Sequence, residues 1–238
     1  MSACRLGFLV HLNRASRPLV NNETYVKTHI NWTVYFILLI ASILATMAVI
    51  PYTLEVQSEA LAQQEFPIPL AAIIALQMVQ NGIILATLIF VGMILANRIG
   101  LGTPILDALT SGASVFDKIR ADLPVSLVLG VMASFLIIGL DVYLFQSRIV
   151  TELGPSADAL THTPGLSRWK GFLASFSGGI AEEIQLRFFA MSLLAWLGSF
   201  VRSTIGGRPT QGVLWLANVG AAILFGLGHL PAVASIVR

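Results

Sequence analysis

Five long apolar runs, separated by shorter polar segments, dominate the chain. They cover residues 32–53, 68–96, 124–145, 169–200 and 213–229. A helix needs about 20 predominantly apolar residues to cross the hydrocarbon core of a bilayer, and each run is near that length or longer. The pattern therefore predicts an all-α protein, a polytopic transmembrane helix bundle with about five or six spans.

The fourth run is too long for a single upright crossing. As an α-helix, residues 169–200 would measure about 48 Å, against a hydrocarbon core of about 30 Å. Three charged residues, Glu182, Glu183 and Arg187, interrupt the run near its middle. We predict that this segment is tilted, kinked or divided.

Composition supports a membrane protein and excludes several other classes. Apolar residues make up 56% of the chain and charged residues only 11%, whereas globular domains carry about 25% charged residues. Intrinsic disorder requires the opposite composition. The net charge of +2 gives no basic field for nucleic acid. The lipid bilayer is the expected partner, and the single cysteine, Cys4, predicts no internal disulfide.

The loop charges predict the domain organisation and the orientation. Residues 1–29 form a polar, basic tail, and residues 30–238 form one transmembrane domain. One set of loops, together with the tail, holds most of the basic residues: Arg5, Arg14, Arg17, Lys27, Arg98, Lys118, Arg120, Arg202 and Arg208. The opposite loops hold only Arg148, Arg168 and Lys170. Because basic loops stay on the cytoplasmic side, the N-terminus is predicted to be cytoplasmic.

The charged cluster in the fourth run is the first candidate site. An ionisable side chain within the bilayer costs at least a few kcal/mol, so its presence indicates a function. Glu183 and Arg187 are four residues apart with the acid first, which favours an ion pair on a helix. Glu182 lies about 100° around the helix from Glu183 and is predicted to remain available for chemistry. The alternative is an ion network that only fixes helix packing.

The fifth run ends at a histidine, which is the second candidate. Phe225 and His229 are four residues apart and share a helix face, so the ring can pack against the imidazole. Pro231 lacks an N–H and predicts a kink close to His229. A lone histidine in a span is more often a packed core residue. Beside a carboxylate from a neighbouring span, it becomes a plausible partner in activating water.

Taken together, the two motifs resemble those of the CPBP or Abi intramembrane proteases, which include the type II CAAX prenyl endopeptidases. The first motif of that family, EExxxR, is matched by Glu182, Glu183 and Arg187, and the second, FxxxH, by Phe225 and His229. The stretches at 98–104 (RIGLGTP) and 225–232 (FGLGHLPA) look like the bacterial branch. The resemblance covers residues 70–238 and implies an integral protein of the bacterial cytoplasmic membrane.

The resemblance implies a hydrolase that cleaves a peptide or protein substrate, with or without a lipid group. Glu182 would act with His229 to activate a water that attacks a peptide carbonyl, and a carboxylate in an apolar cavity is a better base than one in water. A divalent metal such as zinc is one option. However, catalytic zinc usually takes three protein ligands, and the sequence offers at best Glu182 and His229.

One part of the family pattern has no counterpart in this chain. A third motif, whose histidine is thought to stabilise the oxyanion, would lie in a later span. The remaining histidines, His11, His29 and His162, fall in the tail or in loops. We therefore expect that the chain is a shortened form of a longer protein. We also expect weak or no activity, since one oxyanion donor contributes about 10²–10³ in rate.

Two other functions remain open. The first is a non-catalytic membrane protein of the same fold, such as a bacteriocin immunity factor or a scaffold that binds peptide or lipid. The second is a small transporter, which ranks last because no internal repeat is visible. Polar side chains elsewhere in the spans are predicted to hold helices together by hydrogen bonds; these are Gln77, Gln80, Asn81 and Asn218.

Overall fold

A computed structural model describes residues 30–153 and 167–236, so the predicted tail, Cys4 and His162 lie outside the described residues. The helices follow one another along the chain as α1 (Trp32–Val56), α2 (Ser58–Gln63), α3 (Leu70–Ile99), α4 (Pro104–Thr110), α5 (Phe116–Leu140), η1 (Asp141–Phe145), α6 (Gln146–Leu153), α8 (Arg168–Phe176), η3 (Ser177–Glu182), η4 (Ile184–Met191), α9 (Ser192–Val201) and α10 (Gln211–Ile236). Those named η are π-helices, and the others are α-helices.

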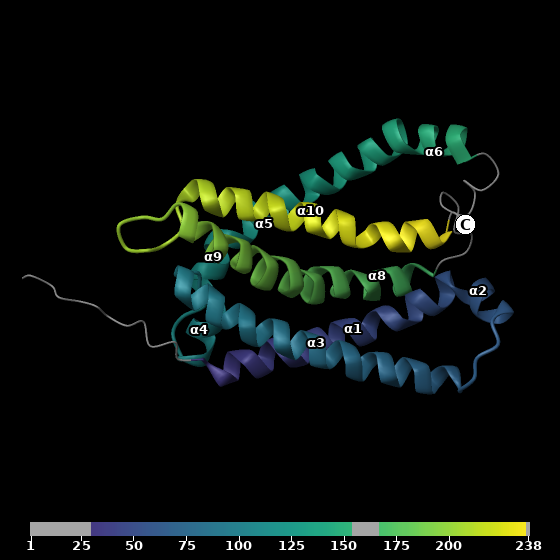
Figure 1. The fold of residues 1–238 in the computed structure, drawn as a ribbon, viewed down its shortest axis with the longest axis horizontal. Coiled ribbons are helices and arrows are strands. Elements are labelled where there is room, and N and C mark those ends of the chain that lie inside the picture. The colour runs from purple at the N-terminus through teal and green to yellow at the C-terminus, as the bar shows by residue number, and fades with distance from the viewer. Residues whose placement is uncertain (1–29, 154–166, 237–238) are drawn as a thin grey trace, which may run out of the picture.

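The predicted all-α transmembrane bundle is confirmed. Within the described residues, five helices are long and apolar enough to cross a membrane: Trp32–Val56, Leu70–Ile99, Asp122–Phe145, Arg168–Val201 and Gln211–Leu230. Their ends lie at the two ends of one elongated bundle (Figure 1). The protein is therefore an integral membrane protein with five candidate spans in its described part.

Local sequence signals set several helix ends. The side chain of Asn31 caps α1 by accepting a hydrogen bond of 3.3 Å from the backbone N–H of Val34, as asparagine at this position commonly does. Gly100, with a φ of 76°, ends α3 in the left-handed conformation that glycine adopts readily. Pro104 begins α4, where its missing N–H costs nothing.

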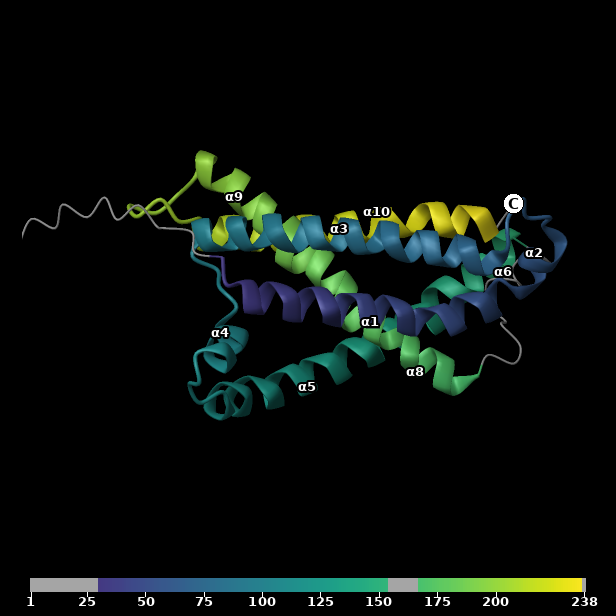
Figure 2. The same ribbon diagram turned by 90° about the horizontal axis from the view of Figure 1, so that it is seen from below.

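The fourth candidate span is the centre of the bundle. It runs through α8, η3, η4 and α9 without a loop, from Arg168 to Val201. It crosses the bundle obliquely, so that α8 and α9 lie on opposite sides of the helices seen in Figure 2. This confirms the predicted tilt. Along its length the span contacts α1, α3 and α10, and its residues are therefore held from three directions.

Two buried clusters fix this central helix. In the first, Val34 of α1 and Ile89 and Met93 of α3 pack around Ile184 of η4. In the second, Ile99 of α3, Ala195 of α9 and Ala217 of α10 pack together. The first cluster positions the π-helical part of the span and the second positions its end, so the backbone that carries the charged residues is anchored on both sides.

Helix α5 stands apart from the other spans (Figure 2). None of its most apolar 18-residue window is buried within the protein, and Phe135 exposes 72% of its surface. A helix that is apolar all round needs an apolar environment. The bilayer supplies that environment in a membrane protein.

The structure corrects the prediction that three amide side chains of the second span hold helices together. Gln77, Gln80 and Asn81 do not join helices, because their side chains are exposed and form no hydrogen bond within the described residues. The hydroxyl of Tyr35 instead donates a 3.3 Å hydrogen bond to the carbonyl of Ala86, which links α1 to α3. Helix α10 runs through Pro231, where we predict a kink, and continues to Ile236.

The close approach of α3 to η4 gives a stability prediction. A Cβ added at Gly92 would lie 2.9 Å from a ring carbon of Phe188 and 3.2 Å from its carbonyl oxygen. We expect Gly92→Ala to destabilise the protein by about 1–3 kcal/mol, the usual cost of overpacking. Gly82→Ala on the same helix is the matched control, because nothing lies within 4 Å of its added Cβ. Thermal unfolding in detergent compares them, and equal midpoints would contradict the packing argument.

Candidate functional site

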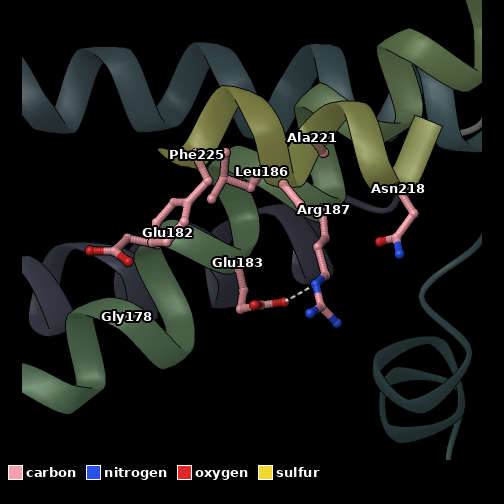
Figure 3. A pocket seen from close by; sticks show the side chains of 9 residues that line it. Gly178, Glu182, Glu183, Leu186, Arg187, Asn218, Ala221 and Phe225 are labelled. Carbon is pink, nitrogen blue, oxygen red and sulfur yellow. Dashed lines mark ion pairs between the residues drawn. The ribbon is translucent and has the colours of Figure 1, made fainter. Parts of the chain in front are cut away.

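The charged cluster lines a cavity of about 260 Å³ between the central helix and α10 (Figure 3). The side of the cavity formed by η3, Glu183 and η4 is polar, and the side formed by α10 is mainly apolar. The lining residues are Gly178, Glu182, Glu183, Leu186, Arg187, Asn218, Ala221, Ala222 and Phe225. The cavity thus brings together both glutamates, the arginine and the phenylalanine of the two sequence motifs.

Glu183 and Arg187 form the predicted ion pair. The Nε of Arg187 lies 3.0 Å from Oε2 of Glu183. The side chain of Arg187 is 68% exposed and that of Glu183 is 47% exposed, so the pair lies at the open side of the cavity. Pairing cancels the two charges locally, which reduces the cost of placing them within a membrane-spanning segment.

Glu182 is the unpaired acid of the cluster. Its side chain is half-buried and has no ion pair or hydrogen bond to any other described residue. Figure 3 shows its carboxylate turned away from the Glu183–Arg187 pair, as the helical spacing predicts. Its Oε2 lies 3.6 Å from the position that a Cβ on Gly178 would take, and nothing lies within 4 Å of that position on Gly179. The surface beside this carboxylate is therefore open.

The backbone here is not the α-helix from which the angles were predicted. Residues 177–182 and 184–191 are π-helical, with only Glu183 between the two stretches. A π-helix is rare, occurs mostly as short bulges and is frequent at functional sites. No feature of the sequence analysis predicted it. The wider turn moves neighbouring side chains around the helix while keeping residues four apart close together, so the ion pair is preserved.

Asn218 is a polar residue of the site whose role the sequence reasoning missed. We predicted a bond between helices, but its side chain forms none within the described part of the chain. It lines the cavity instead, on the same side as Arg187 and away from Glu182 (Figure 3). The available signal was its spacing, because residues seven apart share a helix face and Asn218 precedes Phe225 by seven.

His229 lies one turn beyond Phe225 on α10. The two rings are 4.3 Å apart in an edge-on arrangement, which confirms the predicted ring contact. The Nδ1 of His229 lies 2.9 Å from the Phe225 carbonyl oxygen. Because a carbonyl oxygen only accepts, Nδ1 is the donor in this bond, and Nε2 takes no part in it.

The structure does not bring His229 into the cavity. The ring is exposed and is not part of the lining, and no contact joins it to Glu182. The two predicted partners in water activation therefore occupy neighbouring positions without touching. One helical turn of α10, from Phe225 to His229, separates the histidine from the wall of the cavity.

The side chains do not fit a catalytic zinc ion. Within residues 30–153 and 167–236, no three His, Cys, Asp or Glu side chains gather closely enough to hold a metal. Catalytic zinc usually takes three protein ligands, and the two that the sequence offered, Glu182 and His229, are not in contact.

The fold and the site define a polytopic α-helical membrane protein with a charged lateral cavity. Comparisons with known protein families, with curated proteins and with solved structures find no match to this chain.

The ion pair makes a testable contribution to folding. We expect Glu183→Arg or Arg187→Glu to lower the stability by about 0.5–1 kcal/mol, because each loses the attraction of the pair and adds a like-charge repulsion of similar size. The double variant restores opposite charges and should recover most of the loss. Unfolding midpoints in lipid nanodiscs measure both effects. If the double variant were no better than the single ones, the pair would not be the stabilising element.

Proposed function

We propose that this protein is a membrane-embedded endopeptidase of the CAAX protease or Abi type, in which Glu182 activates water. One observation carries the proposal: an unpaired, half-buried carboxylate lines an open cavity within a membrane-spanning helix. The neighbouring glutamate is neutralised by its own arginine. An unpaired acid in a span is costly, so a function is its best explanation.

The proposed reaction is hydrolysis of a peptide bond. Glu182 accepts a proton from a water molecule, and the hydroxide that forms attacks the peptide carbonyl carbon. The amide of Asn218 donates a hydrogen bond to the developing oxyanion, a role that amide side chains can fill. The C–N bond then breaks, and the protonated Glu182 returns its proton to the leaving amine. Atoms and charge balance without a cofactor.

His229 has a supporting part in this proposal. Its Nδ1 is held by the Phe225 carbonyl, so Nε2 is the ring nitrogen that could meet a substrate. A bound substrate that reaches one turn along α10 would come into contact with it. There it orients the peptide or relays the proton between Glu182 and the leaving group.

Cleavage by the reconstituted protein tests the proposal. The full chain in liposomes is incubated in H₂¹⁸O with a mixed peptide library, once with and once without a farnesyl thioether on the peptides. We expect new carboxyl termini that carry ¹⁸O, because water is the nucleophile. Empty liposomes prepared in the same way are the control. Peptide binding without any ¹⁸O incorporation would contradict the enzyme proposal.

A non-catalytic scaffold of the same fold is the second candidate. The observation in its favour is that Glu182 and His229 do not share the cavity. A cavity lined by a paired and an unpaired acid would then bind a peptide or a lipid headgroup without cleaving it. Binding that leaves the peptides intact supports this candidate, and release of ¹⁸O-labelled fragments excludes it.

We also propose that the N-terminus lies in the cytoplasm of a bacterial cell. The start of α1 lies at the same end of the bundle as the end of α3 and the α9–α10 loop (Figure 1), and Arg98, Arg202 and Arg208 lie at or near that end. To test this, Ser203→Cys is made in a Cys4→Ser background. We expect an impermeant maleimide to label it only in inverted vesicles. Labelling in intact spheroplasts would reverse the orientation.

A further inference from the structure

A second hollow lies between α9 and α10, apart from the charged cavity. It has a volume of about 470 Å³, within the range of 300–1,000 Å³ that is typical of small-molecule sites. It shares no lining residue with the cavity of Glu182. Ala217 lines this hollow and Ala221 lines the charged cavity, and both are only 3% exposed. The contact between the two helices therefore separates the hollows.

The shape of this groove follows from small residues on both helices. At Gly198 the helices meet, because a Cβ there would lie 2.6 Å from Val213. At Gly212, near the end of the groove, nothing lies within 4 Å of an added Cβ. Between these positions, Leu194 and Leu216 supply aliphatic walls. The result is a narrow, apolar trough along the direction of the spans.

The mouth of the groove is basic. Arg202 and Thr210 line the groove at the α9–α10 loop, at the end of the bundle where Arg98 and Arg208 also lie. Arg202 is exposed, and no carboxylate pairs with it within the described residues. An arginine beside a hydroxyl presents several hydrogen-bond donors in a planar fork, the arrangement that suits a phosphate group.

We propose that this groove binds one anionic phospholipid, whose acyl chain lies along the trough and whose phosphate pairs with Arg202. The occupant follows from charge complementarity. An apolar trough beneath the guanidinium of Arg202 matches a long hydrocarbon chain attached to an anion. The lining includes exposed apolar side chains, Val201 (90%) and Leu216 (74%), so a lipid enters the groove laterally from the bilayer.

Two variants separate the chain contact from the headgroup contact. Gly212→Leu adds bulk to the lining at a position where a Cβ meets nothing within 4 Å. Arg202→Gln removes the charge and keeps a polar side chain. Each has a matched control far from the groove: Gly139→Leu on α5, where an added Cβ also meets nothing within 4 Å, and Arg148→Gln, an exposed arginine on α6.

Native mass spectrometry of the delipidated full chain in detergent measures the binding. Phosphatidylglycerol, phosphatidylcholine and inorganic phosphate are titrated separately. We expect phosphatidylglycerol to bind about tenfold more tightly than phosphatidylcholine. Both lipids carry a phosphate, but the choline ammonium of phosphatidylcholine offsets the negative charge that attracts Arg202, and such attraction to anionic lipid contributes about 1 kcal/mol per basic residue. Gly212→Leu and Arg202→Gln should each weaken phosphatidylglycerol binding about tenfold, and the two controls should leave it unchanged.

Three outcomes would overturn the proposal. Equal affinity for both lipids would show that the headgroup charge is not recognised. Unchanged binding by Gly212→Leu, with a normal unfolding midpoint, would show that the chain lies elsewhere. Competition by inorganic phosphate as effective as that by phosphatidylglycerol would mean that the site binds phosphate without the lipid. If Gly212→Leu fails to fold, Arg202→Gln still tests the proposal, because unchanged binding of phosphatidylglycerol by this variant would contradict it.

Discussion

Glu182→Gln is expected to reduce peptide-bond cleavage by about 10²–10⁴-fold, the usual contribution of a general base. Glutamine has the shape of glutamate but does not accept a proton from water at neutral pH. The loss should appear in kcat, with KM little changed, because the amide still occupies the same wall of the cavity. Initial rates in proteoliposomes over a range of peptide concentrations separate the two constants.

This substitution is informative because Glu182 has no partner to lose. Its carboxylate forms no ion pair or hydrogen bond with another described residue, so the fold should tolerate the change. Removing a charge from a span should, if anything, raise the unfolding midpoint. Glu65→Gln, in an exposed position between α2 and α3, is the matched control. Equal kcat values for Glu182→Gln and wild type would remove Glu182 from the mechanism.

The spans and the ion pair could be predicted because each depends on a short-range rule. Residues 32–53 and 213–229 are apolar over the length that a bilayer requires. The helices found there begin within two residues of the predicted starts, and α10 extends past the predicted end to Ile236. Glu183 and Arg187 pair because four residues along any helix return a side chain to nearly the same face. Neither prediction depends on how the helices pack.

The shape of the candidate site could not be predicted for the opposite reason. The π-helical turns around Glu183 depend on how the central helix is held by α1, α3 and α10, and the sequence pattern contains no signal for them. The role of Asn218 likewise depends on packing. An asparagine in a span bonds to another helix or faces a cavity according to which helix lies opposite, and here the opposite wall is the charged cluster.

The relative position of Glu182 and His229 could not be predicted from the two motifs. The spacing within each motif correctly predicted one ion pair and one ring contact. The distance between the motifs depends on the relative shift of α10 along the central helix, which no local rule sets. A shift of one helical turn is about 5.4 Å, and that is the step from Phe225, inside the cavity, to His229 beyond it.

Asn218→Ala should lower kcat by about 10²–10³-fold, the loss that follows removal of one oxyanion donor. Asn218 lines the same cavity as Glu182, at the end where Arg187 lies (Figure 3), and the proposed mechanism requires a peptide carbonyl that reaches from one to the other. KM should change little, because the bond strengthens only as the oxyanion forms. The measurement is the same initial-rate series in proteoliposomes.

Further substitutions of Asn218 distinguish a hydrogen-bond donor to the oxyanion from an amide with a structural role only. Asn218→Asp keeps the size but replaces the donor with an acceptor of like charge to the oxyanion, so it should be at least as damaging as alanine. Asn218→Gln keeps the donor on a longer arm and should retain more of the rate. Asn81→Ala, at an exposed position on α3, should match wild type. If kcat survives in Asn218→Asp, the amide does not face the oxyanion, and Arg187 becomes the remaining donor in the cavity.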